Sequence, residues 1–236
     1  MKLKNFISYL TEILFIMIIS LVVFQPAKIN GGVIVDEEKE IKLSAPTLVS
    51  KTSFEEVLVK RRSIRNFSSK PLSLKELSQL LWSAQGITEK TLGLRTAPSA
   101  GALYPLEIYA VVGNVEEVEA GVYKYKPQNH SLIKIQVGDK RIDIYNSALK
   151  QESIKQSAVC FVITAVYGRT SWKYGNRAER YVHMEVGHAG QNILLQATAL
   201  NLGAVPIGAF YDAQVKSVLR LPKEEEPLYI IPVGKK

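Results

Sequence analysis

The sequence predicts an α+β domain, because helical and strand patterns are mixed along the chain without strict alternation. Ser73 begins a capping box, and the leucines that follow it lie at helical spacing as far as Gly86. Residues 158–166 form a continuous apolar run, which is typical of a strand buried on both faces. Residues 177–200 carry apolar side chains at helical spacing over the longest stretch of the chain.

Shorter patterns give the remaining elements. We expect loop structure over 87–105, where glycine and proline recur. The other expected helices are 53–60, 142–150 and 213–219, and the other expected strands are 108–112, 122–125, 132–137, 204–210 and 228–233.

The bulk composition indicates one globular domain. The chain has 236 residues, of which 47% are hydrophobic and 22% are charged, with a formal net charge of +8. Its lysines and arginines are scattered and form no long basic block, so we expect no nucleic-acid partner. Cys160 is the single cysteine, which excludes a disulfide within the chain, and its apolar neighbours predict a buried strand position.

The first 27 residues predict an export or membrane segment. Lys2 and Lys4 precede an apolar run over 6–24, which favours an uncleaved anchor with the domain outside the cytoplasm. Cleavage after Ala27, with export, and a buried cytoplasmic helix are the alternatives. Residues 28–50 then read as a linker, and the domain is expected over 51–236.

Four segments carry side chains or bare backbone suited to a ligand. In extended backbone, Arg61, Ser63 and Arg65 would share one side, and guanidinium groups bind phosphate in bidentate geometry. Residues 98–105 and 203–208 combine glycine, proline and small side chains, which lets a flat ligand approach the main chain. A solvated basic turn and ordinary loops are the alternatives.

The fourth segment contains Lys173 and Tyr174, which are candidate acid/base groups. A surface lysine and a packing tyrosine are the alternative for this pair. His183 and His188 are five residues apart and would lie on different faces of a helix, so no metal site is expected.

Taken in order, these segments resemble the nitroreductase superfamily, and within it the SagB-type dehydrogenases. The resemblance covers the chain from about Ser53 onward. It is carried by 61–67 (RRSIRNF), 96–107 (TAPSAGALYPLE), 173–177 (KYGNR), 185–192 (EVGHAGQN) and 202–210 (LGAVPIGAF).

The resemblance implies a nitroreductase-like fold, with a mostly antiparallel central sheet flanked by helices, and a homodimer with FMN at the subunit interface. By matching position, the implied FMN-binding residues are Arg61, Arg62, Ser63, Arg65, Pro98, Ser99, Ala100, Gly101, Leu103, Val205, Pro206, Ile207, Gly208 and Lys235. Lys173 and Tyr174 match a pair that is implicated in catalysis in azoline-oxidising relatives.

The expected function is therefore FMN-dependent, two-electron hydride transfer to or from a small organic or peptide substrate. An NAD(P)H-dependent nitro or quinone reductase is one alternative. A membrane-tethered flavin-binding module without turnover is the other.

Overall fold

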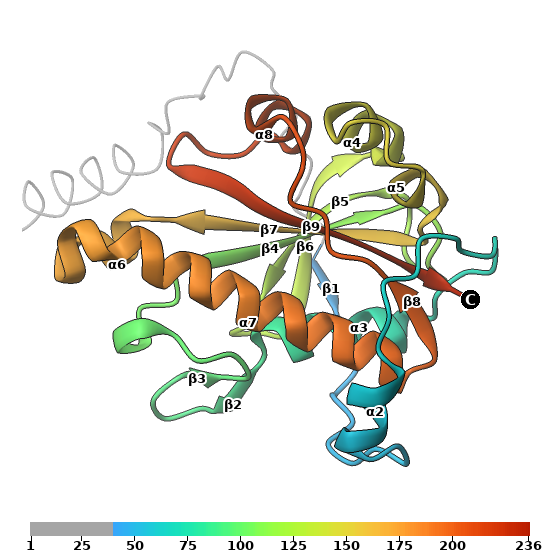
Figure 1. Cartoon of the computed structure of the whole chain (residues 1–236), viewed down its shortest axis with the longest axis horizontal. Helices are drawn as coiled ribbons and strands as arrows, with labels where there is room; N and C mark the ends of the chain where they lie inside the picture. Colours follow the sequence, from blue (N-terminus) through green and yellow to red (C-terminus); the bar gives the residue numbers. More distant parts are fainter. Residues whose placement is uncertain (1–39) are drawn as a thin grey trace, which may run out of the picture. The chain divides into compact units, whose positions relative to one another are not determined.

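A seven-stranded sheet forms the centre of the computed structural model, which describes residues 40–236 (Figure 1). Its strands are β1 (Glu40–Lys42), β4 (Leu106–Val112), β5 (Gly121–Lys126), β6 (Ser131–Val137), β7 (Val159–Val166), β8 (Leu202–Ala204) and β9 (Glu225–Lys235). They lie in the order β1-β6-β5-β4-β7-β9-β8, and every neighbouring pair is antiparallel. The predicted α+β class with a mostly antiparallel sheet is confirmed.

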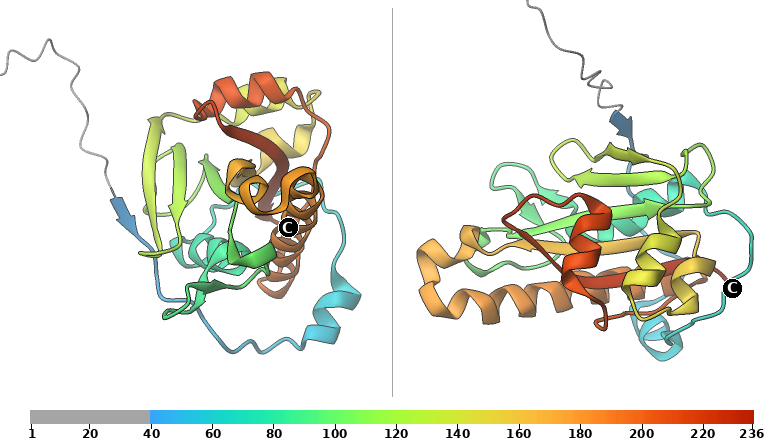
Figure 2. Two further views of the ribbon diagram at one scale, coloured as in Figure 1. Left: turned by 90° about the vertical axis from the view of Figure 1, so that its left-hand side faces the viewer. Right: turned by 90° about the horizontal axis from the view of Figure 1, so that it is seen from above.

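Helices cover both faces of this sheet. They are α2 (Phe54–Lys60), α3 (Leu74–Gln85), α4 (Arg141–Ser147), α5 (Glu152–Gln156), α6 (Gly168–Tyr174), α7 (Ala178–Ala199) and α8 (Asp212–Leu219), with short 3-10 turns at Ala100–Ala102 and Gly175–Arg177. The helices α3 and α7 lie on one face, and α4, α5 and α8 lie on the other (Figures 1 and 2).

The strand β7 separates two hydrophobic cores. Successive strand residues point to opposite faces, and Phe161 and Ile163 join the core under α3 and α7. Cys160 and Val162 join the core under α4, α5 and α8. Because both faces are covered, every residue of β7 except Thr164 is apolar, and the predicted burial of Cys160 is confirmed.

The capping box at Ser73 forms as the sequence predicts. The Ser73 hydroxyl accepts from the Glu76 N–H, and the Glu76 carboxylate accepts from the Ser73 N–H at 2.8 Å. Both bonds satisfy N–H groups that a helix start otherwise leaves unpaired. They set the beginning of α3 and hence the position of its buried leucine face.

Several elements depart from the sequence-based expectations. The edge strand β1 lies inside the expected linker, where Glu40–Lys42 pairs with β6. The expected loop over 87–105 contains a small hairpin of β2 (Ile87–Glu89) and β3 (Leu94–Arg95). The helix expected to reach residue 150 ends at Ser147, and the short strand expected over 204–210 is instead β8, which ends at Ala204.

The expected membrane or export segment over 1–27 lies outside the described residues. Among residues 40–236, no helix is long and apolar enough to cross a bilayer.

Candidate functional site

The arginine segment, which is residues 61–65, lies against β8 at one edge of the sheet. The chain leaves α2 at Arg61 and becomes extended, and Ser63 forms a parallel bridge with Ala204. The Ile64 N–H donates to the Ala204 carbonyl at 2.9 Å. A Cβ on Gly203 would lie 2.8 Å from the Ile64 side chain, so this close packing requires glycine.

The guanidinium groups of this segment have no acidic partner in the part of the chain that the structure describes. None of the ion pairs within residues 40–236 includes Arg61, Arg62 or Arg65. Arg62 donates to the carbonyls of Val59 and Arg61, at 3.0 and 2.7 Å. Since Ser63 and Arg65 are also exposed, the segment offers several donors and positive charges to an anion.

Lys235 lies near the arginine segment, and its ammonium group already forms an ion pair. Its ammonium pairs with Glu76 of α3, and its carbonyl accepts from the Ser68 N–H at 2.9 Å. The structure therefore places Lys235 near the arginine segment, but a contact between Lys235 and an anion would compete with the Glu76 carboxylate.

The loop over 98–105 contacts the predicted catalytic pair directly. A Cβ on Gly101 would lie 2.8 Å from the Tyr174 hydroxyl and 3.0 Å from the Lys173 ammonium. The two groups are side by side as well, with the Lys173 nitrogen 5.5 Å from the Tyr174 ring centroid. Two of the four segments of the sequence analysis thus form one site here, made by this loop and α6.

This loop has an unusual backbone that hydrogen bonds hold in place. Gly101, Ala102 and Tyr104 have φ values of 63, 54 and 46°, in the left-handed region that non-glycine residues rarely adopt. The Ser99 hydroxyl accepts from the Tyr104 N–H at 2.9 Å. Pro98 is exposed, and Ser99, Ala100 and Leu103 are half-buried.

The segment 205–208 offers less free backbone than its composition suggests. The N–H groups of Val205 and Ile207 donate to carbonyls of β9, at 3.3 and 2.8 Å, and both side chains are buried. Pro206 has no N–H group. Gly208 is exposed and is the residue of this segment whose N–H has no partner within residues 40–236.

The predicted residues form two groups rather than one. The arginine segment lies beside β8, which follows α7, whereas Lys173 and Tyr174 precede α7 (Figure 1). The helix α7 has 22 residues. At 1.5 Å per residue it separates the groups by about 33 Å.

A buried polar cluster behind the 98–105 loop was absent from the sequence-based prediction. Glu185 of α7 is 3% exposed, and Arg95 of β3 is its charged neighbour. The Arg95 guanidinium also stacks on the Tyr104 ring at 4.3 Å and donates to Gln85 at 2.9 Å. A glutamate on the apolar face of a predicted helix was the available signal, since its helix neighbours Val182 and Ala189 are core residues.

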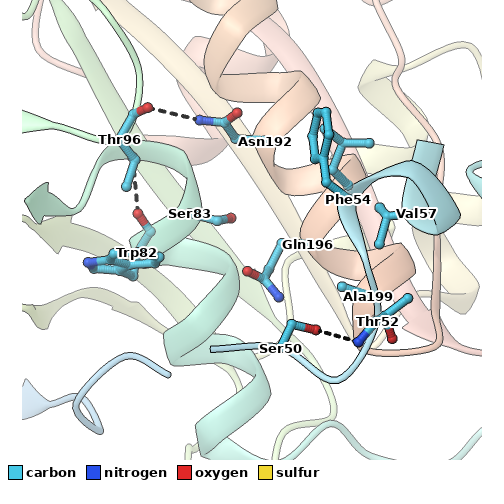
Figure 3. Close-up of a pocket in the computed structure, with 11 residues that line it drawn as sticks. Ser50, Thr52, Phe54, Val57, Trp82, Ser83, Thr96, Asn192, Gln196 and Ala199 are labelled. Carbon is cyan, nitrogen blue, oxygen red and sulfur yellow. Dashed lines mark hydrogen bonds between the residues drawn. The ribbon is translucent and has the colours of Figure 1, made fainter. Parts of the chain in front are cut away.

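An apolar cavity of about 340 Å³ lies between α2, α3 and α7 (Figure 3). Phe54, Val57, Trp82 and Ala199 supply apolar walls, and Asn192 closes one side by donating to the Thr96 carbonyl at 3.4 Å. None of the predicted cofactor or catalytic residues lines it.

The profile of the Nitroreductase family matches residues 58–235. The chain belongs to this family. The match includes the arginine segment, the loop over 98–105 and the whole sheet except β1.

Relatives within and near the family are similar over most of the domain. A candidate nitroreductase of Methanocaldococcus jannaschii is 47% identical to this chain. The similarity covers 80% of this chain and 93% of the relative's length. The microcin B17-processing protein McbC of Escherichia coli is 28% identical over 66% of this chain and 60% of its own.

Solved structures of the family superpose on this fold. A candidate nitroreductase of Ralstonia eutropha has a TM-score of 0.75 at 29% identity and covers 84% of this chain and 90% of its own. One from Anabaena variabilis has a TM-score of 0.74 at 33% identity, and this chain spans only 41% of its length. A chain of the Escherichia coli microcin synthetase McbBCD complex has a TM-score of 0.67 at 26% identity, over 75% of this chain and 69% of its own.

Proposed function

We propose that this chain is an FMN-dependent oxidoreductase of the SagB-type branch, and that it transfers a hydride to or from a small organic or peptide substrate. The observation that carries the proposal is the contact between Gly101 and the pair Lys173 and Tyr174. It joins a glycine-containing loop, which a flat ring can approach, to two groups that can hold or move a proton. The similarity to McbC and to a chain of the microcin synthetase supports this branch.

The donor set fits the phosphate tail of FMN. Three neighbouring arginines, none of them ion-paired within residues 40–236, provide charge and bidentate donors, and Ser63 adds a hydroxyl group. Arg61, Ser63 and Arg65 would hold the phosphate, and Gly208 would offer a main-chain donor to the ring. The bound cofactor would supply two-electron chemistry by accepting or donating a hydride.

The chain's own groups would then position the substrate and manage its proton. Tyr174 presents its hydroxyl group beside Gly101, and the Lys173 ammonium lies next to the Tyr174 ring. Tyr174 would remove a proton from a substrate that is oxidised, or return one to a substrate that is reduced.

Two copies of the chain would complete each site. A mononucleotide is much shorter than the separation of about 33 Å between the two groups along α7, so one copy cannot offer both groups to one FMN molecule. An antiparallel pairing of copies would bring the arginine segment of one beside the Tyr174 loop of the other. Exposed apolar side chains around α2 suit such pairing, namely Leu48, Val49, Phe54, Leu58 and Val59.

The test is the absorbance spectrum and mass of the purified full-length chain. A yellow dimer that releases FMN on denaturation is the expected result. A colourless monomer that takes up no added FMN would overturn the proposal. The M. jannaschii relative favours nitro or quinone reduction as the second candidate, and rapid flavin bleaching by NADPH without a peptide substrate would support it.

A further inference from the structure

We infer that Arg169 is a positioning residue, which joins the 98–105 loop to α6 and so holds the loop backbone against Lys173 and Tyr174. The inference deepens the proposed function and rests on it, because it concerns the same site. Arg169 would act through the two elements that it joins and would contact neither substrate nor cofactor.

The loop and α6 meet at one end of the central sheet (Figure 1). The loop leads into β4, and α6 follows β7. These strands are antiparallel neighbours, and Leu106 at the start of β4 pairs with Ala165 near the end of β7. The Val166 N–H then donates to the Pro105 carbonyl at 2.9 Å. Beyond this bond a side chain continues the connection, since Arg169 contacts the loop.

The backbone at Tyr104 needs contacts to hold it, because its φ of 46° is in the left-handed region. Such a conformation persists only where the surrounding structure determines it. The Tyr104 N–H donates to the Ser99 hydroxyl at 2.9 Å, and the Tyr104 hydroxyl accepts from the Arg95 N–H at 3.2 Å. Ser99 and Arg95 precede Tyr104 by only five and nine residues, so these bonds order the loop locally without placing it against α6.

Arg169 supplies a contact between the loop and α6. Its Nη1 donates to the Tyr104 carbonyl at 3.1 Å, although the two residues are 65 positions apart in the sequence. Its Nη2 forms an ion pair with Glu107, the second residue of β4. The planar guanidinium thus holds the loop with one nitrogen and the sheet with another, and the compact ammonium of lysine lacks this geometry.

The sheet also holds Glu107 from its other side. The Glu107 side chain is 14% exposed, and its second carboxylate oxygen lies 3.6 Å from the Lys124 ammonium of β5. Lys124 in turn pairs with the buried Glu225 of β9 at 2.7 Å. Because three strands contribute to these ion pairs, Glu107 gives Arg169 a fixed point on the sheet.

Arg169 and the reactive pair contact the loop about one helical turn apart. Arg169 and Lys173 are four residues apart in α6, which places them on the same face of the helix. Arg169 contacts Tyr104. Three residues earlier in the loop, Gly101 lies against the Lys173 ammonium and the Tyr174 hydroxyl. Loss of the Arg169 bond should therefore let the loop move away from the pair.

An ion pair that only stabilises the fold is the alternative interpretation. Arg169→Lys distinguishes the two, because lysine keeps a positive charge for Glu107 but has no second nitrogen for the Tyr104 carbonyl. A purely stabilising role predicts that this variant behaves as the wild type. A positioning role predicts a looser loop and slower turnover in a protein of normal stability.

The experiment compares full-length wild type with Arg169→Lys and Arg169→Ala. Amide hydrogen exchange at constant pH is measured for Ala102, Leu103 and Tyr104, whose N–H groups are bonded within the loop, and for β7 as a reference. The rate of flavin reoxidation by an artificial quinone is measured after stoichiometric reduction with dithionite, over a range of quinone concentrations. Arg220→Lys is the matched control, because it makes the same change at an exposed arginine after α8.

In Arg169→Lys we expect the three loop amides to exchange about tenfold faster, the value of one hydrogen bond from a charged donor, while the β7 amides keep their wild-type rates. The maximal reoxidation rate should also fall about tenfold. The quinone concentration at half-saturation, the FMN content and the melting temperature should match the wild type. Arg169→Ala should show the same loop and rate effects with a lower melting temperature, because it leaves Glu107 without this ion pair.

The outcomes separate this inference from the proposed function. Wild-type protein without FMN defeats the proposed function, while the exchange rates still decide whether Arg169 holds the loop. Wild-type loop exchange in Arg169→Lys would overturn the inference, and so would equal acceleration of the loop and β7 amides, which indicates global destabilisation. Wild-type reoxidation kinetics in Arg169→Lys, or an equal loss in Arg220→Lys, would also overturn it.

Discussion

The Tyr174 hydroxyl lies 2.8 Å from the point where a side chain on Gly101 would begin. Gly101 is therefore required twice, once by its φ of 63° and once by the space that Tyr174 occupies. The two requirements can be separated, because Gly93 has a φ of 66° with nothing within 4 Å of the same position.

We predict that Gly101→Ala and Gly93→Ala destabilise the fold similarly, by about 1–2 kcal/mol, the cost of a left-handed non-glycine residue. Only Gly101→Ala should lose turnover, by about 100-fold, because displacement by about 1 Å disturbs a reactive geometry. Chemical denaturation and steady-state kinetics measure the two effects. Equal activity of the two variants would show that the Gly101 contact has no part in turnover.

Removal of the Tyr174 hydroxyl tests its role in proton transfer. Tyr174→Phe should leave FMN content unchanged and slow turnover at least ~100-fold, the low end for general acid–base catalysis. Tyr181→Phe is the control, since it keeps the edge-to-face pair of rings and removes the hydroxyl group of the neighbouring tyrosine on α7. Normal turnover of Tyr174→Phe would exclude the acid/base role.

The arginine segment is tested through affinity for the cofactor. Arg61→Gln and Arg65→Gln should each weaken FMN binding by about 10–100-fold, the value of one hydrogen bond to a charged group. Arg220→Gln, an exposed arginine at the end of α8, provides the control. Fluorescence titration of flavin-free protein gives the dissociation constants, and unchanged constants would place the phosphate elsewhere.

A buried ion pair stabilises the central sheet. Lys124 of β5 pairs with the buried Glu225 at 2.7 Å, and Tyr109 and Thr164 also donate to that carboxylate. Lys124→Met should cost about 3–5 kcal/mol of unfolding free energy, because it leaves a buried charge without its partner.

Lys134→Met is the control for that measurement, since its partner Glu119 is exposed and such pairs contribute about 0–1 kcal/mol. Urea unfolding gives both free energies. Equal losses in the two variants would mean that burial of the Lys124 pair is unimportant.

His130 should make the fold sensitive to acid. It bonds Tyr125 at 2.8 Å through Nδ1 and the Ser44 carbonyl at 2.9 Å through Nε2, and burial lowers its pKa from the ordinary value of 6.5. A base with a lowered folded-state pKa loses stability as the pH falls below the unfolded value.

We therefore expect the melting temperature to decrease below about pH 6.5, and less steeply in His130→Asn. Asparagine suits the φ of 47° at this position. His188→Asn, at an exposed position, should keep the wild-type slope in a thermal scan across pH. The same slope in His130→Asn would assign the acid sensitivity to other groups.

Local patterns were sufficient for the elements that the sequence predicted correctly. The Ser73 capping box and the apolar run of β7 depend on neighbouring residues, and both were found where expected. The helix α6 was missed because it is short and polar, and Arg169 ties it to Glu107 of a distant strand. The polar cluster of Glu185 was missed for a related reason, since its charged neighbour Arg95 is distant in the sequence.

The length of α7 has a genetic consequence under the proposed pairing. Each copy contributes a phosphate-binding end to one site and a Tyr174 end to the other. A subunit carrying Arg61→Gln and Arg65→Gln, mixed with one carrying Tyr174→Phe, would form hybrids in which one site inherits both defects and the other inherits neither. Two inactive alleles would then complement each other when expressed together, although neither encodes a working enzyme alone.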